Sequence, residues 1–256
     1  MKDTVVVRPR RVADPTTRLI CLGFCGGGAG SYGPWADSLP AGVELAAICY
    51  PGREGRFTEP FADDWDTLVE DALSAVHSAT DTRYVLFGHS MGGWMAFDVA
   101  SRIEELGGPL PDALVVSAAN APSRGLTPQD MFPARHESDD QLTDWMRTFG
   151  LLPAHVLDDP DLGEIAVELM RADIRVRDTF RYREGAAVSV PVQILTGDAD
   201  PVIDPHATAQ WRTLSKGVFR HDLLPGGHFY TPDVWRTLPT RIAALDDRSR
   251  VTPSPA

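Results

Sequence analysis

Short apolar runs alternate with amphipathic stretches along most of this chain. The runs with strand character are 18–24, 43–50, 83–87, 113–117, 190–196 and 218–224. Most of them are apolar at every position rather than at every second one, which is typical of strands buried on both faces of a parallel sheet. Helical patterns lie between them at 64–78, 94–106, 207–214 and 234–245. The alternation predicts an α/β fold with a mostly parallel central sheet flanked by helices.

One long segment interrupts the alternation of strands and helices. It contains no convincing strand, but it shows helical patterns at 139–149 and 162–182. A connection of this length inside a compact domain is usually functional, and often forms a lid. The expected organisation is a single domain over 1–256, with a core at about 18–119 and 188–246 and a helical lid insertion at about 120–187.

Composition and charge restrict the function classes. With 256 residues, 43% of them hydrophobic, the chain can bury one large core and has an ordinary globular composition. Its net charge of -12 argues against a nucleic-acid partner, which normally requires a basic face. No stretch is apolar and long enough for a signal peptide or a membrane span. We expect a cytoplasmic protein without a membrane partner, with loosely held ends at 1–17 and 247–256.

The cysteines give no sign of a metal or a disulfide framework. Cys21, Cys25 and Cys49 are too few for such a framework, and the chain has no CxxC pair that would suggest zinc. Cys21 and Cys49 fall within expected strands, where a cysteine usually serves as a small core residue. We therefore expect no metal and no cofactor.

The sequence GHSMGG at 88–93 directly follows the apolar run 84–87. A strand, then Gly-x-Ser-x-Gly, then a helix is the arrangement called the nucleophile elbow, which exposes a serine above the sheet. The glycines are needed because side chains beside Ser90 would clash with neighbouring backbone. The alternative is a tight turn without chemistry. The context predicts that Ser90 is a nucleophile and that the fold is that of an α/β-hydrolase.

A serine nucleophile needs a base, and the base needs an orienting acid. In this fold the acid and then the histidine follow the serine along the chain. GDADP at 197–201 and PGGHF at 225–229 each follow an expected strand. We assign His228 as the base and Asp200 as the acid, with Asp198 as the alternative acid or as a carboxylate that ties the turn.

The glycine-rich sequence CGGGAGS at 25–31 follows the first expected strand. It lacks the lysine of a phosphate-binding loop, and no acidic residue follows at dinucleotide-binding spacing. We interpret it as an oxyanion loop. The predicted donors are the backbone N–H of Met91 and that of Gly26 or Gly27.

Five segments taken together carry a family resemblance: LICLGFCGGGAGSYGPWADSLP, YPGREGRFTEP, FGHSMGG, LTGDADP and LPGGHFY. In this order they resemble the type II thioesterases, free-standing α/β-hydrolases associated with nonribosomal peptide and polyketide synthases. The resemblance extends over about 18–245 and includes the Arg171-Ala-Asp motif. The chain departs from the family at Phe24-Cys25-Gly26, where Pro-His-Ala is frequent.

The resemblance implies hydrolysis of acyl thioesters on the phosphopantetheine arm of acyl or peptidyl carrier proteins, which removes aberrant or stalled acyl groups. It implies the same triad of Ser90, Asp200 and His228. A thiolate is a good leaving group, so access of the substrate matters more than activation of the leaving group.

Two further sets of residues are candidates for substrate contact. Arg53 and Arg56 either contact the pantetheine phosphate or an acidic carrier, or form salt bridges with neighbouring carboxylates such as Glu59. Trp145, Met146 and Phe149 repeat at helical spacing. They either line an acyl chamber or pack the lid onto the sheet.

Other functions remain open at this point. A different esterase, lactonase or amide hydrolase on the same scaffold would prefer free small substrates to carrier-bound ones. A product-releasing thioesterase or cyclase would release a finished product. A non-catalytic binding protein would tolerate the loss of Ser90 or His228, so the intact triad argues against it.

Overall fold

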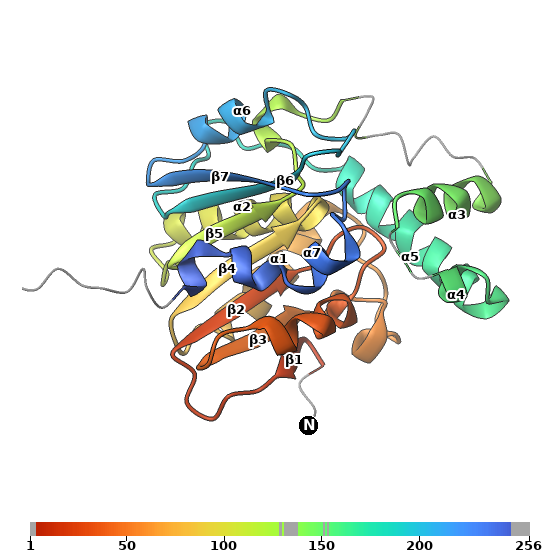
Figure 1. Cartoon of the computed structure of the whole chain (residues 1–256), viewed down its shortest axis with the longest axis horizontal. Helices are drawn as coiled ribbons and strands as arrows, with labels where there is room; N and C mark the ends of the chain where they lie inside the picture. The colour runs from red at the N-terminus through yellow and green to blue at the C-terminus, as the bar shows by residue number, and fades with distance from the viewer. Residues whose placement is uncertain (1–3, 128–129, 131–137, 151, 153, 247–256) are drawn as a thin grey trace, which may run out of the picture.

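The centre of the molecule is a seven-stranded sheet with the strand order β1-β3-β2-β4-β5-β6-β7 (Figure 1). The computed structural model describes residues 4–127, 130, 138–150, 152 and 154–246. The strands are β1 (Val6–Arg10), β2 (Thr17–Leu22), β3 (Val43–Ile48), β4 (Tyr84–His89), β5 (Ala113–Ser117), β6 (Val192–Gly197) and β7 (Phe219–Leu224). All neighbouring strands run parallel except β1 and β3. The predicted mostly parallel sheet is confirmed.

The edge strand β1 was not predicted, because residues 1–17 were expected to be loosely held. In the structure Val6 pairs with Ile48 of β3 and is 1% exposed. The run Val5-Val6-Val7 is β-branched, and such residues favour the extended conformation. This short run adds an antiparallel edge strand to the sheet.

Both faces of the sheet are covered, and successive strand residues point to opposite faces. On β2, Ile20 and Leu22 enter one core, while Leu19 and Cys21 enter the other. The first core packs against α1 (Trp65–His77), α2 (Met91–Glu105) and α6 (Ala207–Thr213). The second packs against η1 (Ala29–Ser38) and α7 (Pro232–Arg236). Burial on both faces explains why these strands are apolar at every position.

The helix expected at 234–245 is shorter than predicted. It divides into α7 and the 3-10 segments η5 (Leu238–Arg241) and η6 (Ala243–Leu245). Pro239 lies in the interior of the expected helix, where it has no N–H to donate and its ring disfavours the helical backbone before it. Leu238 and Leu245 nevertheless enter the second core, so the apolar pattern reflects burial without a continuous helix.

A helical insertion joins β5 to β6, as predicted. It contains η3 (Pro122–Arg124), α3 (Asp139–Thr148), α4 (Ala154–Leu157) and α5 (Pro160–Asp178). Of these, α3, α4 and α5 lie together at one side of the sheet layer (Figure 1). The expected lid at 120–187 includes 128–129, 131–137, 151 and 153, which lie outside the described residues.

Candidate active site

The turn between β4 and α2 holds Ser90 in a strained conformation. Its φ of 53° and ψ of -123° lie outside the regions that L-residues usually adopt. A Cβ on Gly88 would lie 1.8 Å from the carbonyl oxygen of Gly92, and one on Gly92 would lie 2.4 Å from that of Leu22. Only glycine fits at both positions. The geometry is that of a nucleophile elbow.

Ser90, His228 and Asp200 lie together at the carboxyl ends of β4, β7 and β6. The Nε2 atom of His228 is 3.0 Å from Ser90 Oγ, and its Nδ1 atom is 2.9 Å from Asp200 Oδ2. The Asp200 side chain is fully buried, and the His228 side chain is 8% exposed. With Nδ1–H donated to the carboxylate, Nε2 is left to accept the serine proton. This is the arrangement of side chains that nucleophilic catalysis at a serine requires.

The two aspartates of the GDADP loop make different contacts. Asp200 reaches His228 with one oxygen and accepts the N–H of Val202 at 2.9 Å with the other. Asp198 Oδ1 accepts the N–H of Gly226 at 2.8 Å, which ties two neighbouring loops together. Asp198 thus has the contacts of the turn-tying carboxylate, and Asp200 has those of the orienting acid.

The predicted oxyanion donors need a correction. The N–H of Gly26 donates to Asp173 Oδ2 at 2.8 Å, and the N–H of Gly27 donates to the carbonyl oxygen of Phe24 at 2.9 Å. Within the described part of the chain, the N–H groups of Cys25 and Met91 have no acceptor. Both residues line the cavity beside Ser90. The free pair is therefore Met91, at the start of α2, and Cys25 rather than a glycine.

The cavity in front of Ser90 has a volume of about 250 Å³ and mostly apolar walls. Trp94, Trp145, Phe149 and Met170 are among its lining residues. Trp145 and Phe149 of the predicted set thus border the site. Met146 does not, because it is fully buried in the first core, where it packs the insertion onto the sheet.

Arg53 and Arg56 are not available to a carrier or a phosphate. Arg53 is 3% exposed and its guanidinium pairs with Asp173. Arg56 is 6% exposed and pairs with Glu59 and with Asp71 of α1. Arg56 therefore follows the alternative in which the arginines form salt bridges with neighbouring carboxylates. For Arg53 the partner lies far away in the sequence, which local spacing does not reveal.

A second serine–histidine pair lies beneath the first. His89 Nδ1 is 3.0 Å from Ser117 Oγ, which in turn is 2.7 Å from the hydroxyl of Tyr230. His89 and Ser117 are both 0% exposed. Burial, and then the nearby charge of His228, lower the pKa of His89 well below its usual value. This histidine is held neutral, and Ser117 is not among the residues that line the cavity beside Ser90.

Asn120 is a site residue that the sequence did not reveal. It lines the cavity just beyond β5, donates to the carbonyl oxygen of Val202 at 2.9 Å, and accepts the N–H of Asp204 at 2.8 Å. These bonds attach the loop that carries Asp200 to the end of the neighbouring strand. Its place after a predicted strand was the available signal, since sites in α/β folds form at carboxyl ends.

The described residues contain no group of three or more His, Cys, Asp or Glu residues placed to hold a metal ion. No described helix is long and apolar enough to cross a membrane. Burial raises the pKa of the Cys25 thiol to about 12, so this cavity-lining group stays protonated at neutral pH.

Comparison with known proteins shows the family to which the chain belongs. Residues 17–242 match the thioesterase domain family. The chain is 37% identical over 84% of its length to the AMB antimetabolite synthetase AmbE of Pseudomonas aeruginosa, and spans 10% of that protein. It is 33% identical to the thioesterase PikA5 of Streptomyces venezuelae, covering 86% of this chain and 78% of that one.

A solved structure, the type II thioesterase BorB from the borrelidin biosynthetic cluster, superposes with a TM-score of 0.84. Its identity is 34%, over 96% of this chain and 99% of that one. The chain belongs to the thioesterase family, as a type II thioesterase with the α/β-hydrolase fold.

Proposed function

We propose that this thioesterase hydrolyses acyl groups from the phosphopantetheine arm of carrier proteins and so clears stalled or aberrant acyl chains during peptide or polyketide biosynthesis. The observation that carries the proposal is the chain of contacts from Asp200 through His228 to Ser90 beside an apolar cavity. The similarity to BorB, a type II thioesterase from a biosynthetic cluster, supports the substrate class.

The contacts support a two-step mechanism through an acyl-enzyme. Ser90 Oγ attacks the thioester carbonyl carbon while His228 Nε2 takes the hydroxyl proton. The N–H groups of Met91 and Cys25 stabilise the negative oxygen of the tetrahedral intermediate. The C–S bond then breaks, and His228 returns the proton to the leaving thiolate.

Water completes the cycle. It attacks the acyl carbon on Ser90, His228 takes its proton, and the collapse of the second tetrahedral intermediate returns this proton to Ser90 Oγ. The products are the free acid and the carrier with its thiol restored. Throughout, Asp200 stabilises the imidazolium that forms twice in the cycle.

The partners of this reaction are acyl and peptidyl carrier proteins, and the compartment is the cytoplasm. With Arg53 and Arg56 buried, docking of an acidic carrier depends on other contacts. The three free, buried cysteines suit a reducing environment.

A substrate comparison tests the proposal. One acyl group is presented on a carrier protein, on free pantetheine and as a p-nitrophenyl ester, and kcat/KM is measured for each. We expect the highest value for the carrier-bound thioester and the free acid as the product. A preference for the free ester would favour a general esterase, and a cyclised product would favour a product-releasing enzyme. Carrier without an acyl group serves as the competitor control.

A further inference from the structure

A buried ion pair joins the insertion to the glycine-rich loop. Arg53 donates to both oxygens of Asp173, with distances of 2.8 Å from Nη1 to Oδ2 and 2.6 Å from Nη2 to Oδ1. Asp173 is 2% exposed and Arg53 3%. Desolvation makes such a pair a weak source of stability, which favours a role in fixing local structure.

The contacts of the pair converge on the oxyanion loop, residues 25–31. Asp173 Oδ2 accepts the N–H of Gly26 at 2.8 Å, and Arg53 Nη1 donates to the carbonyl oxygen of Gly27 at 2.7 Å. Both are charge-assisted hydrogen bonds, which are stronger than neutral ones. Gly26 has a φ of +72°, a conformation that glycine adopts without strain. The ion pair thus fixes the backbone on the carboxyl side of Cys25.

Glu54 fixes the far side of the same loop. Its carboxylate accepts the N–H groups of Ala29 and Gly30 at 2.9 Å and 2.8 Å. The two acceptor residues, Asp173 and Glu54, lie outside the loop. The N–H of Cys25, beside Ser90, is left without an acceptor among the described residues. The loop is therefore shaped by side chains from two other segments of the chain.

We propose that Asp173 is a positioning residue, which acts from α5 through Gly26 to hold the Cys25 N–H where it stabilises the tetrahedral intermediate. The inference rests on the proposed function of Ser90. Preorganised donors lower the barrier only when they are aimed at the developing oxyanion, and small displacements are costly. Because Asp173 belongs to the insertion, the position of α5 and the shape of the oxyanion loop are linked.

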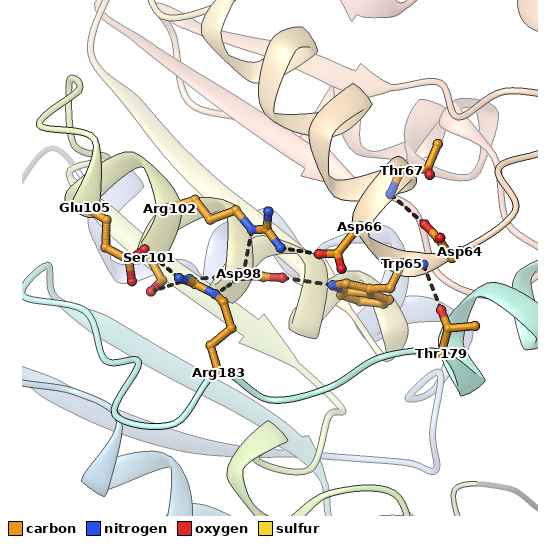
Figure 2. Close-up of polar contacts among 10 residues, drawn as sticks. All are labelled: Asp64, Trp65, Asp66, Thr67, Asp98, Ser101, Arg102, Glu105, Thr179 and Arg183. Atoms are coloured by element: carbon orange, nitrogen blue, oxygen red, sulfur yellow. Dashed lines mark hydrogen bonds and ion pairs between the residues drawn. The ribbon is translucent and has the colours of Figure 1, made fainter.

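The insertion has a second anchor that does not touch the oxyanion loop. Figure 2 shows that Arg183, just beyond α5, donates to three side chains of α2: Asp98, Ser101 and Glu105. In the same region the hydroxyl of Thr179 accepts the N–H of Trp65. Loss of this anchor loosens the insertion but leaves Asp173 beside Gly26. It therefore provides a control for effects that arise only from stability.

The test compares two double variants in which both buried charges are removed. Arg53→Met with Asp173→Asn keeps an amide oxygen for the Gly26 N–H, whereas Arg53→Met with Asp173→Leu does not. We expect the leucine variant to have a kcat for acyl-pantetheine about 10- to 100-fold lower than the asparagine variant, with a similar KM. Its affinity for n-butylboronic acid, which forms a tetrahedral adduct with serine, should fall by the same factor.

Three controls make the outcome decisive. Arg183→Gln should lower the melting temperature without changing kcat or boronic acid affinity. Asp173→Ala in the Arg53→Met background replaces the leucine variant if that one does not fold. Labelling of Ser90 by a fluorophosphonate in the unaltered protein separates the two proposals, because its absence would overturn the nucleophile itself. Equal kcat and equal boronic acid affinity in the two double variants would overturn the role of Asp173.

Discussion

Two serine–histidine pairs with the same oxygen–nitrogen distance lie close together in the described part of the molecule. The pair Ser90–His228 and the pair Ser117–His89 each have an oxygen–nitrogen distance of 3.0 Å. The two imidazole rings lie with their centroids 5.2 Å apart. The first pair opens on the cavity and has a carboxylate as its third member. The second is fully buried, and its third member is the hydroxyl of Tyr230.

The difference shows that residue types and distances do not by themselves make a catalytic site. A general base must become an imidazolium during the reaction, and this charge needs a nearby carboxylate or water. Asp200 supplies the carboxylate to His228, while the surroundings of His89 oppose its charge. The buried pair instead connects elements: the Tyr230 hydroxyl also lies 3.1 Å from the carbonyl oxygen of Leu195 on β6. It supports the loop that carries His228.

Replacing the two serines should separate the pairs most clearly. We expect Ser90→Ala to lower kcat by about 10⁵- to 10⁶-fold, because the attacking oxygen is lost and the rest of the triad cannot substitute for it. Ser117→Ala should keep kcat within about threefold, since Ser117 contacts no substrate. The measurement is hydrolysis of one acyl-pantetheine under identical conditions. A larger loss for Ser117→Ala would reverse the assignment of the nucleophile.

The aspartates give the next largest contrast. We expect Asp200→Asn to lower kcat by about 10⁴-fold, because an amide in that place favours the wrong tautomer of His228. Asp198→Asn keeps an acceptor for the N–H of Gly226 in the neighbouring loop and should change kcat by less than about tenfold. Steady-state kinetics of both variants decide between them. Comparable losses would mean that the two carboxylates share the role of the acid.

The triad could be predicted from the sequence because each member follows a strand in the order that the fold requires. Ser90 and His228 each stand beside glycines that mark a tight turn, and Asp200 is the later acidic residue of its loop. These signals are local. The chain order and the local motif together defined the site without knowledge of any contact.

The features that the sequence did not reveal depend on distant contacts. The N–H of Gly26 donates to Asp173, which lies 147 positions away in the chain. Because spacing carries no information about such a partner, the glycines were predicted as donors in place of Cys25. The partner of Arg53 was not predicted for the same reason, since the salt-bridge alternative considered its acidic neighbours in sequence and the actual partner, Asp173, is on α5. Edge strand β1 was missed because its short β-branched run is stabilised by tertiary contacts, above all the pairing with β3, which lies far away in the chain.

Loss of the buried Ser117 hydroxyl should lower stability, although it leaves activity almost unchanged. We expect Ser117→Ala to lower the free energy of unfolding by about 1–3 kcal/mol, because His89 and Tyr230 each lose a hydrogen-bond partner in a buried environment. Ser90→Ala should change it by less than about 1 kcal/mol, because alanine keeps the Cβ and leaves the backbone strain at the elbow unchanged. Urea unfolding of both variants measures this. A stability loss confined to Ser90→Ala would contradict the structural role of the second pair.

The smallest expected effect concerns the protonation of His89. The pKa of His89 in the folded protein lies well below that of an unfolded histidine. Below the unfolded pKa, the unfolded chain therefore binds a proton at this residue while the folded protein does not. The stability that His89 contributes is therefore present above the unfolded pKa and is lost as the pH falls. Between pH 7.5 and 5.5 the loss amounts to about 1.4 kcal/mol for a single histidine.

We expect the free energy of unfolding of His89→Asn to depend less steeply on pH than that of the unaltered protein, as measured by urea unfolding at a series of pH values. His221 on β7, whose pKa is also lowered by burial but which is less enclosed, provides the control: His221→Gln should flatten the profile less. If the two variants flatten it equally, the buried pair is not the more strongly desolvated of the two sites. A profile unchanged by His89→Asn would mean that His89 is protonated in the folded protein, and the contrast between the two serine–histidine pairs would then rest on access of the substrate alone.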